Sequence, residues 1–191
     1  MSKRVLVIPE DPTLDQYVLQ PVIAAACRHI GFEHARVRVL TDPAFKGVSQ
    51  ALDPELLQEV VERYPMVDLF LLCVDRDGLV GRDESVAEKC ERMDAYLKPG
   101  QTFAGRTAEQ ELEVWCVAAS LPKGWKMADV RAEPHSKERF FEPLVSSLKL
   151  DDSPGAGREI LGRKAAKKYS SIRKRCVELQ DIEGLISSGL A

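Results

Sequence analysis

The chain has 191 residues, 45% of them hydrophobic and 30% charged, and its 27 basic and 30 acidic residues give a net charge of −3. This composition excludes a disordered chain and a uniformly basic nucleic-acid-binding protein, although it allows a local basic patch. No apolar run reaches the roughly 20 residues that span a bilayer, and we expect the first residues to form a strand and not a signal peptide. The five cysteines are widely spaced and argue against a disulfide framework or a zinc site, which predicts a reducing, cytoplasmic location.

Strand and helix patterns alternate from the start of the chain. A nearly continuous apolar run predicts a buried strand over 4–8, and apolar residues at helical spacing predict a helix over 14–30. Asp11 and Asp15 flank the start of that helix and suit capping roles. Polar and apolar residues alternate over 35–40, which predicts a more exposed strand.

The strongest strand pattern lies in the middle of the chain. Asp53 and Pro54 suit the N-cap and first position of a second helix, and Pro65 follows its end. The apolar run over 67–74 then predicts a strand buried on both faces at the centre of a sheet. This order of elements favours parallel pairing.

Two more helices and one short strand follow this central strand. Asp83 suits the N-cap of a helix that reaches about residue 97, and 101–104 predicts a last short strand. Thr107 and Gln110 have the spacing of a capping box, which predicts a helix over 108–119. Trp115 falls on the apolar face of this helix and is expected in the core.

The strand–helix alternation predicts an α/β fold, a Rossmann-like parallel sheet with helices on both faces. Strand patterns stop after residue 121. We therefore expect an α/β domain over 1–120 and a helical C-terminal extension, 121–191, that packs on it. In the extension, Ser136 suits the N-cap of a charged surface helix.

Acidic residues follow two of the predicted strands. Glu10 comes after the first strand, and Asp75 and Asp77 come after the central one. Ligands of parallel α/β sheets bind beyond the carboxyl ends of the strands, so these side chains meet there if the two strands are neighbours. Carboxylates without His or Cys suit Mg²⁺ or Mn²⁺. The alternative is that they only form turns and caps.

These motifs resemble the TOPRIM domain of topoisomerases, primases, recombination proteins and OLD-type nucleases. The likeness rests on Glu10 after strand one and on Asp-x-Asp-Gly from Asp75 to Gly78. The run from Gln110 to Trp115 also resembles the Gln-Glu-x-Glu-x-Trp helix of a bacterial TOPRIM-like family of unknown function. Members of the wider group are encoded beside ATPases in mobile or phage-defence loci, which implies an ATPase partner.

The resemblance also implies roles for single residues. Glu10 matches the TOPRIM glutamate, regarded as the general acid/base, and Asp75 and Asp77 match the aspartates that bind Mg²⁺. Glu111 and Glu113 match an accessory acidic pair without an assigned role. By spacing alone, we expect Glu111 to point away from Glu113, and Glu113 to share a solvated helix face with Glu109.

Two features limit what the resemblance implies. Many TOPRIM domains have Gly after the glutamate, whereas here Asp11 and Pro12 follow it, which leaves room for a degenerate site. Topoisomerases also need a tyrosine nucleophile on a separate domain. A chain of this length is not expected to carry one, so strand passage is not expected.

A basic segment lies near the C-terminus, where 158–176 contains eight basic residues and one acidic residue. This basic segment is expected either to bind a phosphate backbone or to form an ordinary exposed helix face. In the first case, the candidate nucleic-acid-binding residues are Arg163, Lys164, Lys167, Lys168, Arg173 and Lys174.

Three functional hypotheses follow. The first is a Mg²⁺- or Mn²⁺-dependent TOPRIM-like phosphodiesterase, a nuclease acting on DNA or RNA, with Glu10, Asp75 and Asp77 as its catalytic and metal-binding residues. The second is a non-catalytic TOPRIM-like subunit that binds an ATPase or nucleic acid. The third is a phosphatase of the haloacid dehalogenase type, ranked last because Gly78 follows the Asp-x-Asp element and the element lies in mid-chain.

Overall fold

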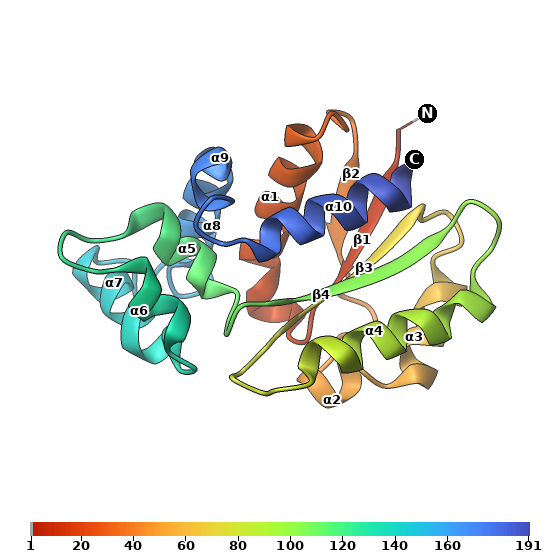
Figure 1. The fold of residues 1–191 in the computed structure, drawn as a ribbon, viewed down its shortest axis with the longest axis horizontal. Coiled ribbons are helices and arrows are strands. Elements are labelled where there is room, and N and C mark those ends of the chain that lie inside the picture. Colours follow the sequence, from red (N-terminus) through yellow and green to blue (C-terminus); the bar gives the residue numbers. More distant parts are fainter. Residues whose placement is uncertain (1) are drawn as a thin grey trace.

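Four parallel strands form the single sheet of the computed structural model, which describes residues 2–191. The strands are β1 (Arg4–Ile8), β2 (Arg36–Val39), β3 (Leu69–Asp75) and β4 (Thr102–Ala108), in the order β2-β1-β3-β4 (Figure 1). Helices cover both faces of the sheet. The α/β, Rossmann-like class expected from the sequence is confirmed.

The helices follow the strands in an alternating order that continues into a helical C-terminal third. They are α1 (Pro12–His29), α2 (Val48–Ala51), α3 (Pro54–Arg63), α4 (Arg82–Met93), the 3-10 turn η1 (Asp94–Tyr96), α5 (Glu113–Ser120), α6 (Met127–Ala132), the π-helical turn η2 (Lys137–Phe141), α7 (Glu142–Ser147), α8 (Arg158–Lys167), α9 (Tyr169–Ile172) and α10 (Glu178–Leu190). Among residues 2–191, each helix is too short or too polar to cross a bilayer.

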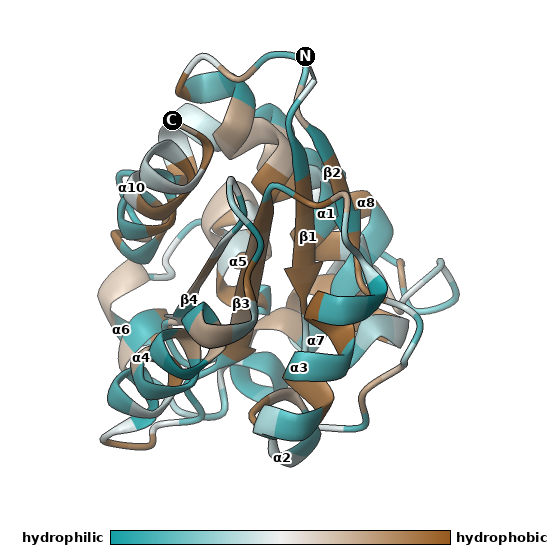
Figure 2. Ribbon diagram, turned by 90° about the vertical axis from the view of Figure 1, so that its right-hand side faces the viewer, coloured by the Kyte–Doolittle hydropathy of each residue, from teal (hydrophilic) through white to brown (hydrophobic). Residues whose placement is uncertain are grey.

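Side chains alternate along the strands into two apolar cores. Val7 and Leu71 face the core under α1, α5, α8 and α10, whereas Ile8 and Phe70 face the core under α2, α3 and α4. In Figure 2 the central strands β1 and β3 are mostly hydrophobic and the outer faces of α3 and α4 are hydrophilic. β3 is buried on both faces and pairs with β1 and β4, so the central position predicted for 67–74 is confirmed.

The connections reverse direction between β1 and β3. From β1 the chain crosses by α1 on one face to β2, whereas α3 and α4 lie in the core on the opposite face. This leaves β3 and β4 without a crossover helix on the α1 face. α10 lies against β4 and β3 there, and an added side chain at Gly189 would collide with Leu69. Part of the segment 121–191 thus completes the sheet's helical layer.

Several helix boundaries follow the caps that the sequence predicts. Asp11 precedes α1 and accepts a hydrogen bond from the backbone N of Thr13 at 2.8 Å, and Asp15 accepts one from the N of Asp11 at 3.1 Å. Asp53 caps α3, with Pro54 as its first residue. α1 therefore begins two residues earlier than its apolar pattern indicates.

The helix predicted over 108–119 is wrong in its first part. Parallel pairing with β3 keeps the chain extended through Ala108, and α5 begins only at Glu113. Gln110 has a φ of 63°, which is not helical. The Thr107 hydroxyl donates a hydrogen bond of 2.6 Å to the Asp83 carboxylate and does not cap α5. The predicted strand 101–104 is therefore longer, and Asp83 lies inside the first turn of α4, whose N-cap is Gly81.

The close contact between α1 and α8 gives a stability test. An added Cβ at Gly162 in α8 would lie 2.2 Å from the backbone O of Tyr17, whereas one at Gly184 in α10 would meet nothing within 4 Å. We expect Gly162→Ala to lower the free energy of unfolding by about 1–3 kcal/mol through overpacking. Gly184→Ala should raise it by about 0.5–1 kcal/mol through helix propensity. Urea unfolding of both variants measures this, and equal effects would contradict the packing described.

Candidate metal centre

The carboxyl ends of three neighbouring strands carry the acidic residues. Glu10 follows β1, Asp75 ends β3, and Glu111 follows β4. Because the connections reverse direction between β1 and β3, this edge is the topological switch point, where ligands of open α/β sheets bind. The neighbouring positions of the two predicted acidic strand ends are therefore confirmed.

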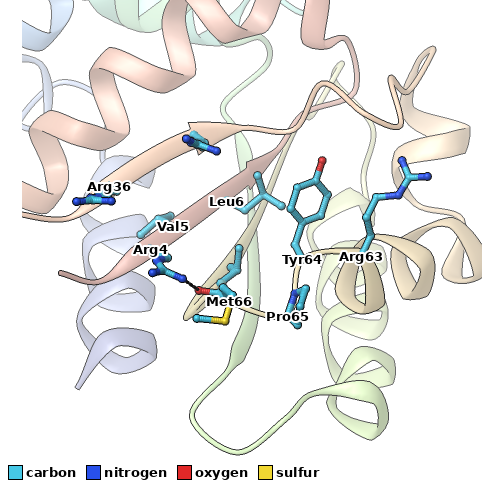
Figure 3. A pocket seen from close by; sticks show the side chains of 10 residues that line it. Arg4, Val5, Leu6, Arg36, Arg63, Tyr64, Pro65 and Met66 are labelled. Atoms are coloured by element: carbon cyan, nitrogen blue, oxygen red, sulfur yellow. Dashed lines mark hydrogen bonds between the residues drawn. The ribbon is translucent and has the colours of Figure 1, made fainter. Parts of the chain in front are cut away.

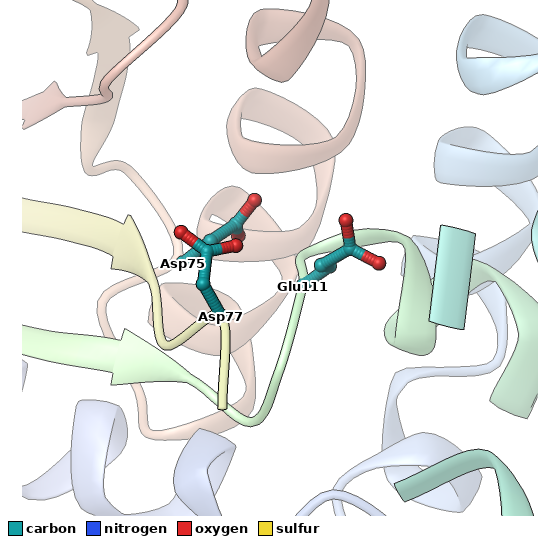
Figure 4. Close-up of side chains that lie close together, drawn as sticks. All are labelled: Asp75, Asp77 and Glu111. Carbon is teal, nitrogen blue, oxygen red and sulfur yellow. The ribbon is translucent and has the colours of Figure 1, made fainter. Parts of the chain in front are cut away.

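Three carboxylates form the tightest acidic group. Asp75, Asp77 and Glu111 each offer an oxygen atom, and these atoms lie within 4.8 Å of one another (Figure 4). Asp77 is exposed, Asp75 is partly buried and Glu111 is buried. A set of three carboxylate oxygens suits a hard cation with oxygen ligands, so this group can hold a metal ion.

The turn after β3 is fixed by the segment that follows β4. The backbone N–H groups of Arg76 and Asp77 both donate to the carbonyl O of Gln110, at 2.8 and 3.0 Å. Asp77 itself has a φ of 52°. The Asp75 carboxylate accepts a hydrogen bond from the backbone N of Leu112 at 2.9 Å. These bonds hold the Asp-x-Asp turn beside Glu111.

Glu10 lies next to this group in a different role. Its Oε1 accepts a hydrogen bond from the backbone N of Asp75 at 2.9 Å, which leaves Oε2 outside that bond. Burial raises the pKa of Glu10, and the negative charge of Asp77 raises it further. Glu10 therefore joins the ends of β1 and β3, while Glu111 completes the three-carboxylate group.

The two accessory glutamates have separate partners. Glu111 accepts hydrogen bonds from the Ser136 hydroxyl at 3.1 Å and from the backbone N of Lys137 at 2.6 Å. Glu113 is buried and pairs with Arg158, whose Nε lies 2.8 Å from its Oε1. Both line one cleft, so the expectation that Glu111 points elsewhere is wrong, because 108–112 is not helical.

Burial and nearby negative charge raise the pKa of Asp75 and Glu111. The pKa of Asp75 lies well above its ordinary value, first because of burial and then because Glu113, Glu10 and Asp15 place negative charge around it. Burial also raises the pKa of Glu111. Arg82 is 4.0 Å from Asp77, too far for a hydrogen bond. A divalent cation would relieve this repulsion.

The acids open onto a cleft of about 650 Å³ that also holds basic groups. Its charged lining comprises Glu10, Asp11, Asp15, Asp75, Asp77, Glu111, Glu113, Lys46, Lys137 and Arg158. The sequence predicts only a capping role for Asp15. It is a cap, but its carboxyl group is also buried in this lining, and burial raises its pKa to about 7.

Other predicted surface residues have structural contacts. Glu109 pairs with Arg76 and Arg131, and Glu113 with Arg158, so the solvated face predicted for the two glutamates is wrong. Trp115 is confirmed in the core, where its indole N–H donates 2.9 Å to Glu178.

Ser136 also differs from its predicted role as an N-cap. It lies just before η2, but its side chain makes no capping hydrogen bond there. The hydroxyl is buried and donates to Glu111 across the fold. A residue predicted at a helix start on the surface thus supports the acidic cleft.

The basic segment is partly used within the fold. Lys168 donates 3.0 Å to the carbonyl O of Ala119, Arg173 pairs with Glu183, and Arg163 pairs with Glu159. Of the six candidate nucleic-acid-binding residues, the following make no side-chain hydrogen bond or ion pair within residues 2–191: Lys164, Lys167 and Lys174.

Comparison with known proteins gives no further guide. No family model, curated protein or solved structure matches the chain. The TOPRIM resemblance therefore rests on the sequence motifs alone.

Asp15 makes the stability of the metal-free protein depend on pH. Its pKa is 3.8 when unfolded and about 7 when folded, so between these values the folded state binds more protons. The contribution of Asp15 to the free energy of unfolding is therefore fully present below about pH 4 and is lost as the pH rises through 7. The total loss is at most about 4 kcal/mol. In EDTA, Asp15→Asn should flatten the fall in unfolding free energy between pH 5 and 8. The exposed Asp152→Asn is the control, and identical slopes for the two variants would contradict the assignment.

Proposed function

We propose that the protein is a divalent-cation-dependent phosphodiesterase of TOPRIM-like type that cleaves DNA or RNA. The observation that carries the proposal is the meeting of Asp75, Asp77 and Glu111 oxygens within 4.8 Å at the switch point of the sheet. Like charges at this separation repel one another strongly unless a cation or protons neutralise them. The carboxylate set fits Mg²⁺ or Mn²⁺, with Asp75, Asp77 and Glu111 as the residues that would hold the ion.

The surrounding residues support phosphate chemistry. A divalent ion in such a site would neutralise phosphate charge and lower the pKa of a bound water. Glu10 has a raised pKa and a second oxygen outside its bond to Asp75, so it suits the role of general acid/base. Lys46 and Lys137 line the same cleft and can attract the phosphate backbone.

A second candidate is a non-catalytic subunit that binds an ATPase or nucleic acid. The specific observation in its favour is the start of α1: Asp11 caps the helix and Pro12 opens it directly after Glu10. One carboxylate oxygen of Glu10 also accepts a hydrogen bond from the backbone N–H of Asp75 and is therefore already engaged. In this candidate the acidic group is structural, and Lys164, Lys167 and Lys174 remain for contacts with a partner.

Cation binding is tested by thermal melting. Asp75→Asn removes a charge from the crowded group, so in EDTA we expect it to raise the melting temperature. At Mn²⁺ concentrations about 100 times Kd, the wild type should gain about 2.7 kcal/mol, or roughly 5–10 °C, and Asp75→Asn should gain almost nothing. Glu88→Gln, an exposed acid on α4, is the control and should respond like the wild type. No Mn²⁺ response in the wild type would refute the metal site.

Cleavage is tested with single- and double-stranded DNA and RNA in Mg²⁺ or Mn²⁺. We expect Asp75→Asn, Asp77→Asn and Glu10→Gln each to lower the rate at least about a hundredfold, and Glu88→Gln to keep it. Each product's length and end groups should be the same in the wild type and in Glu88→Gln.

The same assay separates the two candidates. Equal cleavage by all four variants would mean that a contaminant is responsible. Mn²⁺ stabilisation without cleavage of any substrate would favour the non-catalytic subunit.

A further inference from the structure

A second pocket lies at the opposite end of the strands from the acidic cleft. It has a volume of about 380 Å³ and is formed by the start of β1, by β2 and by the segment between α3 and β3 (Figure 3). We name it the arginine pocket, and it is lined by Arg4, Val5, Leu6, Arg36, Arg38, Arg63, Tyr64, Pro65, Met66 and Val67. Four of these ten residues are arginines and none is acidic.

The arginines come from three different elements. Arg36 and Arg38 are two residues apart on β2, so they share a face of this edge strand, and both are exposed. Neither makes a side-chain hydrogen bond or ion pair with residues 2–191. Arg4 on β1 donates 3.2 Å to the carbonyl O of Met66, and Arg63 at the end of α3 is paired with Asp42. Two guanidinium groups are therefore free at the mouth of the pocket.

The base of the pocket is apolar. Leu6 is only 4% exposed, and Tyr64 lies beside it in Figure 3, while Pro65 also lines the pocket. The Tyr64 hydroxyl donates 2.5 Å to the carbonyl O of Asp42, which fixes the orientation of the ring. Met66 is 66% exposed at the same rim. A flat aromatic ligand could thus cover apolar surface that water now contacts.

Charged residues on an edge strand also protect it from pairing with other chains. That role accounts for exposed arginines on β2. It does not require a hollow with an apolar base, nor the approach of Arg4 and Arg63 from neighbouring elements. The combination of free guanidinium groups and an aromatic platform matches a ligand that is anionic at one end and flat at the other.

We propose that the arginine pocket binds a nucleoside phosphate. Its phosphates lie against Arg36 and Arg38, since guanidinium groups bind phosphate through paired hydrogen bonds. Its base covers Tyr64 and Leu6. The volume suits a small ligand, as such pockets occupy about 300–1,000 Å³. No divalent cation is needed, so the proposal stands or falls independently of the nuclease activity.

Isothermal titration with ATP in EDTA tests the proposal. We expect saturable binding at one site per chain, weakened at least about tenfold in the double variant Arg36→Ala/Arg38→Ala and clearly weakened in Tyr64→Leu. Arg92→Ala, an exposed arginine on α4 outside the pocket, is the matched control and should bind like the wild type. Asp75→Asn should also bind like the wild type.

Three further titrations identify the part of the ligand that is recognised. Inorganic triphosphate should bind more weakly than ATP, and adenosine more weakly still. A 5′-phosphorylated dinucleotide distinguishes a free nucleotide from the end of a nucleic acid, and tighter binding of either form supports the proposal. Absence of saturable ATP binding, or an equal loss in Arg92→Ala and the double variant, would overturn it. Equal binding of triphosphate and ATP would overturn the assignment of the nucleoside.

Discussion

Asp75 joins three neighbouring strand ends, and the architecture of the acidic cleft depends on this linkage. Its backbone N–H donates to Glu10 beyond β1, and its carboxylate accepts a hydrogen bond from Leu112 beyond β4. These two bonds draw β1, β3 and the start of α5 to one edge of the sheet. They also force several carboxylates into a small, partly buried volume, where burial and the nearby negative charges of Glu113 and Glu10 raise the pKa of Asp75. The fold thus builds a group that protons or a cation must neutralise.

The acidic cleft and the arginine pocket have linings of opposite predominant charge, and they lie at opposite ends of the strands. Carboxylates gather where the parallel strands end, and guanidinium groups gather where β1 and β2 begin. Within the cleft the charges are further sorted, because Arg158 neutralises Glu113 but no basic side chain forms a close pair with Asp75 or Glu111 in the described chain. The three-carboxylate group therefore has the negative charge and the oxygen atoms that can hold an external cation.

The sequence predicts the central strand, the caps at Asp11 and Asp53, and the placement of Glu10 beside Asp75, because strand period and strand-end chemistry are local. Helical spacing wrongly directs Glu111 away from the group, and only the resemblance implies an accessory acidic role for it. Thr107 and Gln110 have capping-box spacing, but pairing with β3 holds that segment extended and overrides the local preference. The Glu113–Arg158 pair and the arginine pocket join residues far apart in the chain, which periodicity cannot reveal.

The position of α10 on the sheet has a consequence for synthesis on the ribosome. β3 and β4 have apolar surface on the α1 side, and α10 lies against both strands there. The segment that buries this surface lies about 100 residues downstream of β3, so these contacts have a high sequence separation and form slowly. Until α10 has been synthesised, the nascent chain exposes this apolar face of the sheet, and exposed apolar surface and unfinished sheets make incomplete chains prone to aggregation.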